Sequence, residues 1–215
     1  SLALGLRYGP YIVKTDSVGN VAWEEWYTSS DNTEVKGVDK SPFGGYILSG
    51  KTEALNGGGV FDFYLLKISE TGTFEWHNSY GGAGVQGAWD VIATLDSTYI
   101  MAGNDEISGS RGYLIMTDSF GNVVWEKKFG LTQDNHAIVN ILQLKDSSFV
   151  CAGASSFLGD TMQVQGWLLK LDKNCDSIWS VFDGNSNVPD YFYGLSLAKD
   201  GGFVVSGQYN RIGAP

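Results

Sequence analysis

The sequence predicts an all-β protein made of one unit that recurs about every fifty residues. The first sign is a tryptophan that returns at separations of 53, 49 and 54 residues: Trp23, Trp76, Trp125 and Trp179. A glycine recurs with a similar spacing: Gly50, Gly103, Gly153 and Gly207. The composition agrees, with 43% apolar residues, only 18% charged residues and 29 glycines, as in a protein of short strands and tight turns. No segment has a sustained apolar period of 3.6 residues, so we expect almost no helix.

The net charge of −10 limits the classes of partner. An acidic surface repels phosphate backbones and anionic membranes, so we expect no nucleic-acid partner. No apolar run approaches the roughly 20 residues of a membrane span, which predicts none. The first residues have neither a basic region nor a long apolar segment, so we expect any export signal to lie outside this sequence. Two cysteines, Cys151 and Cys175, predict neither a disulfide framework nor a metal pair, and Cys151 aligns with apolar core residues of the other copies.

Each repeat divides into four predicted strands, A to D. In the second copy these are residues 35–39, 44–50, 63–69 and 74–80. Segments of type B recur at 99–103, 149–153 and 203–207, and segments of type C at 11–16, 113–118 and 167–172. Types B and C are nearly continuous apolar runs, which indicates strands that are buried on both faces. A four-stranded meander covered on both faces is typical of one blade of a β-propeller, and this is the fold that we predict.

The turn between strands C and D has its own pattern. Asp16 and Asp118 stand where a carboxylate can accept hydrogen bonds from the turn backbone, and a glycine with positive φ closes the hairpin. We therefore interpret Asp16, Asp118 and Asp172 as turn residues rather than as acids or ligands. Cys175 replaces the glycine in the last copy, so either it has a positive φ or the turn is reshaped.

A tryptophan follows each of these turn positions by four residues, in the pairs Gly19/Trp23, Gly72/Trp76, Gly121/Trp125 and Cys175/Trp179. An indole over a glycine backbone can lock neighbouring blades together, because only glycine permits so close an approach. This spacing resembles the tryptophan-docking motif of quinoprotein-like propellers.

The repeat as a whole resembles a second group of propeller proteins. The segment Trp167-Leu-Leu-Lys-Leu-Asp, the following Trp179 and the segment Asp200-Gly-Gly-Phe-Val-Val-Ser-Gly are similar to the β-propeller repeats of secreted and surface proteins of Bacteroidetes-type bacteria. Such proteins are often exported through type IX secretion or lipid-anchored at the outer membrane. The resemblance implies an extracellular or cell-surface location and is nearly silent on activity.

We expect residues 1–215 to form one propeller domain or propeller segment, with repeats at about 1–33, 34–86, 87–136, 137–190 and a partial 191–215. Two alternatives remain open for the ring. In one, strands at 192–199 and 203–207 pair with residues 8–28 and close four blades. In the other, which we favour, the chain is part of a propeller of six to eight blades, and residues 2–5 resemble a spare strand B.

Binding is expected on one rim, where the connections vary in length. These are the B-to-C loops 51–61, 104–112 and 154–166, and the D-to-A loops 28–34, 81–87, 130–136 and 183–190. The candidate ligand-binding residues are Trp89, Asp90, Asp105, Glu106 and His136. Trp89 beside Asp90 suits sugar recognition, and Asp105 with Glu106 lacks the ligand spacing of a known calcium loop.

Catalytic residues are not evident. His77, expected on an exposed outer strand, and His136, expected in a rim loop, form no triad or metal site, so we predict no catalytic residue, metal or cofactor. The first hypothesis is a non-catalytic surface propeller that presents its loop face to a protein or glycan, or acts as a scaffold. The alternative is a propeller domain of a secreted glycan-active or quinoprotein-like enzyme whose catalytic groups lie elsewhere.

Overall fold

The computed structural model describes residues 8–27, 31–53, 60–82, 84–106, 110–130, 135–156, 164–184 and 189–209. These residues contain sixteen strands and no helix, so the prediction of an all-β protein is confirmed. It follows that the described residues include no helix suited to crossing a membrane.

Twelve of the strands form three antiparallel four-stranded sheets in which every strand pairs with its neighbours in the chain. The first sheet contains β3 (Thr33–Lys40), β4 (Tyr46–Thr52), β5 (Asp62–Ile68) and β6 (Phe74–Tyr80). The second contains β7 (Gln86–Ala93), β8 (Tyr99–Asp105), β9 (Arg111–Thr117) and β10 (Val123–Phe129). The third contains β11 (Asn135–Gln143), β12 (Phe149–Ser156), β13 (Val164–Leu171) and β14 (Ser177–Asp183). Two separate hairpins complete the structure, β1 (Tyr11–Thr15) with β2 (Val21–Trp26) and β15 (Tyr191–Leu197) with β16 (Phe203–Gln208).

The predicted meander of strands A to D is therefore present three times. The bounds of β6 agree with the predicted strand 74–80, and the predicted B and C segments fall on β4, β8, β12 and on β5, β9, β13. Every residue of β5, β8 and β12 is buried, which confirms that the middle strands are covered on both faces. Cys151 lies in this core at 1% exposure, and both cysteines are unpaired thiols.

The sheets stack face to face in chain order. The first strand of each sheet packs on the preceding sheet, so that β7 contacts β3, β4 and β5, and β11 contacts β7, β8 and β9. One cluster shows how this buries apolar surface: Ile47 and Leu65 of the first sheet pack with Val91 of the second. The first strands β3, β7, β11 and β15 also contact one another in succession, which makes them the inner edge of the stack.

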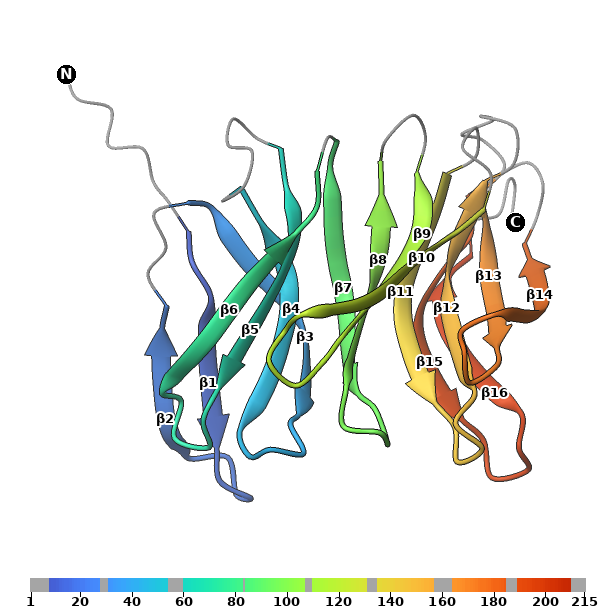
Figure 1. Ribbon diagram of the computed structural model, residues 1–215. Helices are drawn as coiled ribbons and strands as arrows, with labels where there is room; N and C mark the ends of the chain where they lie inside the picture. The colour runs from blue at the N-terminus through green and yellow to red at the C-terminus, as the bar shows by residue number, and fades with distance from the viewer. Residues whose placement is uncertain are drawn as a thin grey trace, which may run out of the picture.

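The row of sheets is open. Figure 1 shows the sheets following one another from the blue hairpin β1–β2 to the red hairpin β15–β16, with the two hairpins at opposite ends. Neither hairpin pairs with the other, so the four-sheet closure that the sequence left open is not formed by the described residues. Residues 2–5, which we interpreted as a spare strand, lie outside the described residues.

The turns between third and fourth strands have the predicted chemistry. Asp118 Oδ1 accepts hydrogen bonds of 2.9 Å from the amides of Phe120 and Asn122, and Asp16 Oδ1 does the same for Val18 and Asn20. These hydrogen bonds lower the pKa of Asp16 and Asp118, with the side chains of Asn20 and Asn122 as the largest cause. Cys175 has a φ of 59°, so this residue keeps the left-handed conformation and the turn is not reshaped.

The first three recurring tryptophans, Trp23, Trp76 and Trp125, dock between sheets, and each of these rings covers the turn of the following sheet. A Cβ atom on Gly72 would lie 2.9 Å from Trp23 Cε3, and one on Gly121 would lie 2.8 Å from Trp76 Cζ3. Trp125 packs against the cluster that contains Cys175, the residue at the same turn position. The predicted tryptophan-over-glycine contact is thus present at Gly72 and Gly121, with the glycine supplied by the next repeat, whereas Gly19 lies beneath no tryptophan among the described residues.

Hydrogen bonds reinforce each of these contacts. Trp23 Nε1 donates to the carbonyl of Glu70 at 3.0 Å, and Tyr80 Oη donates to the carbonyl of Gly121 at 2.7 Å. At the third junction Lys127 Nζ donates to the carbonyl of Asn174 at 2.7 Å. The fourth strand of each sheet therefore holds the next sheet by both ring packing and polar contacts.

We predict that Gly121→Ala destabilises the protein more than Gly19→Ala. Both glycines have positive φ, 81° and 91°, so both substitutions lose about 1 kcal/mol from the backbone conformation. Only Gly121 lies beneath an indole, because a Cβ on Gly19 would meet nothing within 4 Å. Displacing Trp76 adds about 1–3 kcal/mol to the loss of unfolding free energy in Gly121→Ala. Urea unfolding of the two variants measures this difference. Equal losses in the two variants would contradict the docking role.

Candidate binding site on the inner strands

Each of the four first strands carries a β-bulge at the same position. The register shifts between Val35 and Gly37, Ala88 and Asp90, Ile138 and Asn140, and Phe192 and Gly194. The extra residues, here called the inner row, are Lys36, Trp89, Val139 and Tyr193. A bulge re-aims one side chain away from the regular alternation of a strand, and bulges are frequent beside functional sites.

The inner row runs from sheet to sheet, and its members are exposed except for Val139, which is half-buried. Trp89 is 40% exposed and Tyr193 is 50% exposed, both high values for aromatic residues on strands. Lys36 Nζ lies 3.6 Å from the centroid of the Trp89 ring, so these two members of the row are in contact. The predicted binding residue Trp89 thus belongs to a repeated structural feature.

Polar side chains surround Trp89. Its Nε1 donates to Asn104 Oδ1 at 2.9 Å, and Asn104 Nδ2 donates to Glu106 Oε1 at 3.0 Å. These side chains and Lys51 border a cavity of about 70 Å³. Because the cavity is small, a ligand would meet the exposed ring of Trp89 from outside and reach the polar groups at its edge.

Glu34 forms ion pairs with both lysines of this region. Its Oε1 lies 3.4 Å from Lys36 Nζ and 3.1 Å from Lys51 Nζ. Burial alone would raise the pKa of Glu34, but the hydrogen bond from Lys51 and the charge of Lys36 outweigh burial and lower it. The surroundings of Trp89 therefore combine charged groups of both signs.

Asp90, the second predicted binding residue, turns away from the inner row. Its Oδ2 accepts a hydrogen bond of 3.0 Å from the amide of Ile141 on β11, and its Oδ1 accepts one from Val91. Burial raises the pKa of Asp90. A Cβ on Gly37 would lie 2.7 Å from Asp90 Cα, so β3 and β7 approach closely here. The Asp90 carboxylate therefore joins β7 to β11.

Asp105 forms the centre of a buried ionic cluster. It is 0% exposed and accepts from Arg111 Nη2 at 3.0 Å, Lys128 Nζ at 2.8 Å and Gln86 Nε2 at 3.0 Å. Burial would raise the pKa of Asp105, but Lys128 and the other donors lower it. A metal ion would have to displace two cationic side chains from this carboxylate. Glu106 is exposed, and the described residues contain no group of three potential metal ligands.

The place of His136 in the fold differs from the predicted one. The prediction that it lies in a rim loop is wrong, because it is the second residue of β11 and is 4% exposed, with its ring 5.2 Å from that of Trp167. His77, by contrast, is exposed on β6 as predicted.

The backbone at His136 connects two neighbouring sheets. Its amide donates to the carbonyl of Ser110 at 2.7 Å, and the equivalent amide of Gln86 donates to the carbonyl of Phe61 at 2.7 Å. The described ends of the B-to-C and D-to-A connections therefore meet on one rim, as the sequence predicted. The central parts of these connections, including 54–59, 131–134 and 157–163, lie outside the described residues.

Lys36, Val139 and Tyr193 are members of the inner row that the sequence analysis missed. A signal for them exists, because all four members of the row stand 14 residues before the recurring glycine of the second strand. The partners of Trp89 that come from other strands, such as Lys51 and Asn104, carry no such signal and are brought there by the pairing of the strands.

We predict that Asp105→Asn lowers the free energy of unfolding by up to about 3 kcal/mol, because two cations lose a buried carboxylate but retain some access to water. Glu106→Gln is the matched control and should change stability by less than about 0.5 kcal/mol. Urea unfolding at pH 7 measures both, and an Asp105→Asn protein as stable as the control would contradict the role of the cluster.

We predict that Asp90→Asn gains stability relative to the unsubstituted protein as the pH rises from 3.5 to 7. The folded pKa of Asp90 lies above its ordinary value of 3.8, so the folded state binds more protons than the unfolded state between the two values. The unsubstituted protein therefore loses stability as the pH rises through this window, whereas the asparagine variant does not. The readout is the difference in unfolding free energy against pH, and a difference that is constant with pH would contradict the prediction.

Comparison with known proteins adds no relative from which a function could be transferred. No protein-family model and no curated protein matches this chain. The residues around Trp89, and their geometry, are therefore the basis for inferring a function.

Proposed function

We propose that this chain forms blades of a β-propeller that binds a glycan on its inner face and catalyses no reaction. The propeller arrangement is supported by the three stacked four-stranded meanders, by the inner edge that their first strands share, and by the docking of each sheet on the next. Propellers typically contain four to eight such sheets around a central axis, which would place the inner row at the axis.

The single observation that carries the binding role is the exposed ring of Trp89 amid hydrogen-bonding side chains. Sugars bind proteins by stacking a face of the ring on an aromatic side chain while their hydroxyl groups pair with polar groups nearby. Asn104, Glu106 and Lys51 border the same cavity as Trp89 and supply donors and acceptors. The other exposed aromatic of the row, Tyr193, offers a second stacking surface two sheets away.

A neutral glycan fits this surface better than an acidic one. The chain has a net charge of −10, which disfavours sulfated and other polyanionic polysaccharides. The two lysines beside Trp89 share the carboxylate of Glu34, and Glu106 lines the same cavity, so the four charges of this region sum to zero. An extracellular or cell-surface location remains part of this proposal and rests on the resemblance to exported bacterial repeats.

The arrangement of carboxylates gives no support to an enzyme. Glycoside hydrolysis requires two available carboxyl groups roughly 5–9.5 Å apart. Asp90 is committed to the amides of two strands, and Asp105 to two cations and an amide. Asp90 therefore joins two sheets, and Asp105 joins the strands of one sheet.

We predict that Trp89→Ala weakens binding to neutral polysaccharide by at least about tenfold, because a central aromatic anchor usually contributes about 2 kcal/mol or more. Affinity electrophoresis in gels containing xylan, mannan or β-glucan measures this. Trp26→Ala is the matched control, since Trp26 is 61% exposed on β2 and lies outside the inner row. Retardation by none of these polysaccharides, or an equal effect of the two substitutions, would refute glycan binding at Trp89.

A further inference from the structure

The first sheet contributes three charged side chains to the surroundings of Trp89. Glu34 and Lys36 belong to β3, and Lys51 belongs to β4. Glu34 and Lys51 stand directly opposite each other in the paired strands. Glu34 Oε1 also forms an ion pair with Lys36, so one carboxylate is shared by two ammonium groups.

Each ammonium group lies between this carboxylate and an aromatic ring. Lys36 Nζ is 3.4 Å from Glu34 Oε1 and 3.6 Å from the centroid of the Trp89 ring. Lys51 Nζ is 3.1 Å from the same oxygen and 4.3 Å from the centroid of the Phe61 ring. A cation within about 6 Å of a ring centroid is attracted by the electrons of that ring. The carboxylate and the two rings therefore hold both lysines in place.

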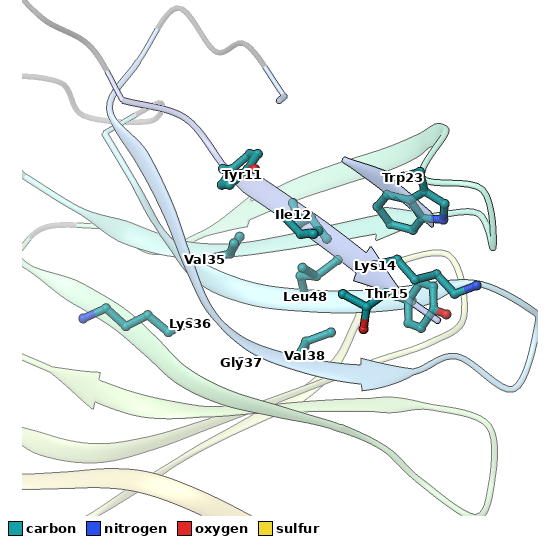
Figure 2. Close-up of a pocket in the computed structure, with 12 residues that line it drawn as sticks. Tyr11, Ile12, Lys14, Thr15, Trp23, Val35, Lys36, Gly37, Val38 and Leu48 are labelled. Atoms are coloured by element: carbon teal, nitrogen blue, oxygen red, sulfur yellow. The ribbon is translucent and has the colours of Figure 1, made fainter. Parts of the chain in front are cut away.

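The side chain of Lys36 is directed toward the candidate site. This residue borders a cavity of about 400 Å³ between β1 and the strands β3 and β4, but its side chain extends away from Ile12, Val38 and Leu48 (Figure 2). Its ammonium group lies instead at the ring of Trp89. Lys36 is therefore part of the surroundings of Trp89 and not of the apolar cavity.

The charged group is confined to one of the described sheets. The positions of Glu34, Lys36 and Lys51 correspond to Gly87, Trp89 and Asn104 in the second sheet, and to Ala137, Val139 and Ala154 in the third. Because two sheets adopt the same meander without charge at these positions, the fold does not require it. The charges depart from the repeat only beside the exposed ring of Trp89, which points to a role in binding.

Solvent reaches all three charged side chains. Glu34 is 34% exposed, Lys36 is 30% exposed and Lys51 is 29% exposed. Burial would raise the pKa of Glu34, but the hydrogen bond from Lys51 and the charge of Lys36 lower it, so Glu34 is ionised at neutral pH. A carboxylate on a ligand would therefore meet the two ammonium groups only in competition with Glu34, and would be repelled by it.

We propose that Glu34 is a specificity-determining residue that makes the Trp89 site reject uronic-acid glycans in favour of neutral ones. Glu34 occupies the place at the two ammonium groups that the carboxylate of such a sugar would take. Specificity often depends on a repulsive group of this kind as well as on attractive contacts. Without Glu34, the two lysines would outnumber Glu106, the carboxylate that borders the same cavity. The proposal rests on the glycan binding proposed above and adds the group that selects between glycans.

The test is calorimetric titration of the unsubstituted chain and of Glu34→Gln at low ionic strength. The ligands are neutral oligosaccharides of xylose, mannose or glucose, and oligosaccharides of galacturonate. The unsubstituted chain should bind a neutral ligand more tightly than galacturonate. In Glu34→Gln the ratio of galacturonate affinity to neutral affinity should rise at least about threefold, the effect in water of one charge at about 6 Å from a ligand charge.

Two further variants assign this change to the lysines. Asp96→Asn is the matched control, because it removes one carboxylate from the exposed turn between β7 and β8 and should leave the affinity ratio unchanged. Glu34→Gln/Lys36→Met removes one of the released charges but keeps an unbranched side chain beside Trp89, so the ratio should return toward that of the unsubstituted chain. Urea unfolding verifies that each variant is folded.

The outcomes separate this proposal from the proposed function. An unchanged ratio in Glu34→Gln, an equal rise in Asp96→Asn, or a preference of the unsubstituted chain for galacturonate would overturn the role of Glu34 while leaving glycan binding intact. If neither the unsubstituted chain nor any variant binds a neutral oligosaccharide, glycan binding at Trp89 is refuted, and the selection by Glu34 is refuted with it.

Discussion

Contact between a tryptophan ring of one sheet and the tight turn of the next is the interaction on which the stack depends. Trp23 and Trp76 each lie against a glycine of the following sheet, at distances that leave no room for a side chain. The contact is specific because the turn needs a positive φ and the ring needs a bare backbone, and glycine meets both requirements. Cys175 shows that the third junction tolerates a side chain when that side chain is itself buried in the core. Since the contacts recur, they set a similar relation between successive sheets.

That relation brings the first strands together and creates the candidate site. The bulge at the same position of each first strand turns Lys36, Trp89, Val139 and Tyr193 out of the regular alternation. Asp90 beside the bulge then bonds the next first strand, and Asp105 at the rim gathers two cations. The carboxylates therefore fix the strands, and the exposed aromatic residues are left as the groups available to a ligand. This division of roles is the basis for proposing binding rather than catalysis at this site.

The ends of the row follow the same physical rule as its middle. Apolar positions that are covered inside the row, such as those of Val91 and Ile47, are exposed at its ends as Val38 and Val204. Unpaired strand edges and exposed apolar residues favour association with a matching edge.

The sequence by itself determined the repeat, the four strands of each unit, the burial of the middle strands, and the turn chemistry of Asp16, Asp118 and the glycines. These properties depend on local periodicity and backbone conformation, which neighbouring residues express directly. It also pointed to Trp89 as a candidate, but it misplaced His136 and did not pair Asp105 with Lys128. Those outcomes depend on which strands lie side by side. Only the tertiary structure decided that Trp23, Trp76 and Trp125 cover the turn of the next repeat and that the row of described sheets is open, because contacts between residues some fifty positions apart arise from sheet stacking and not from local pattern.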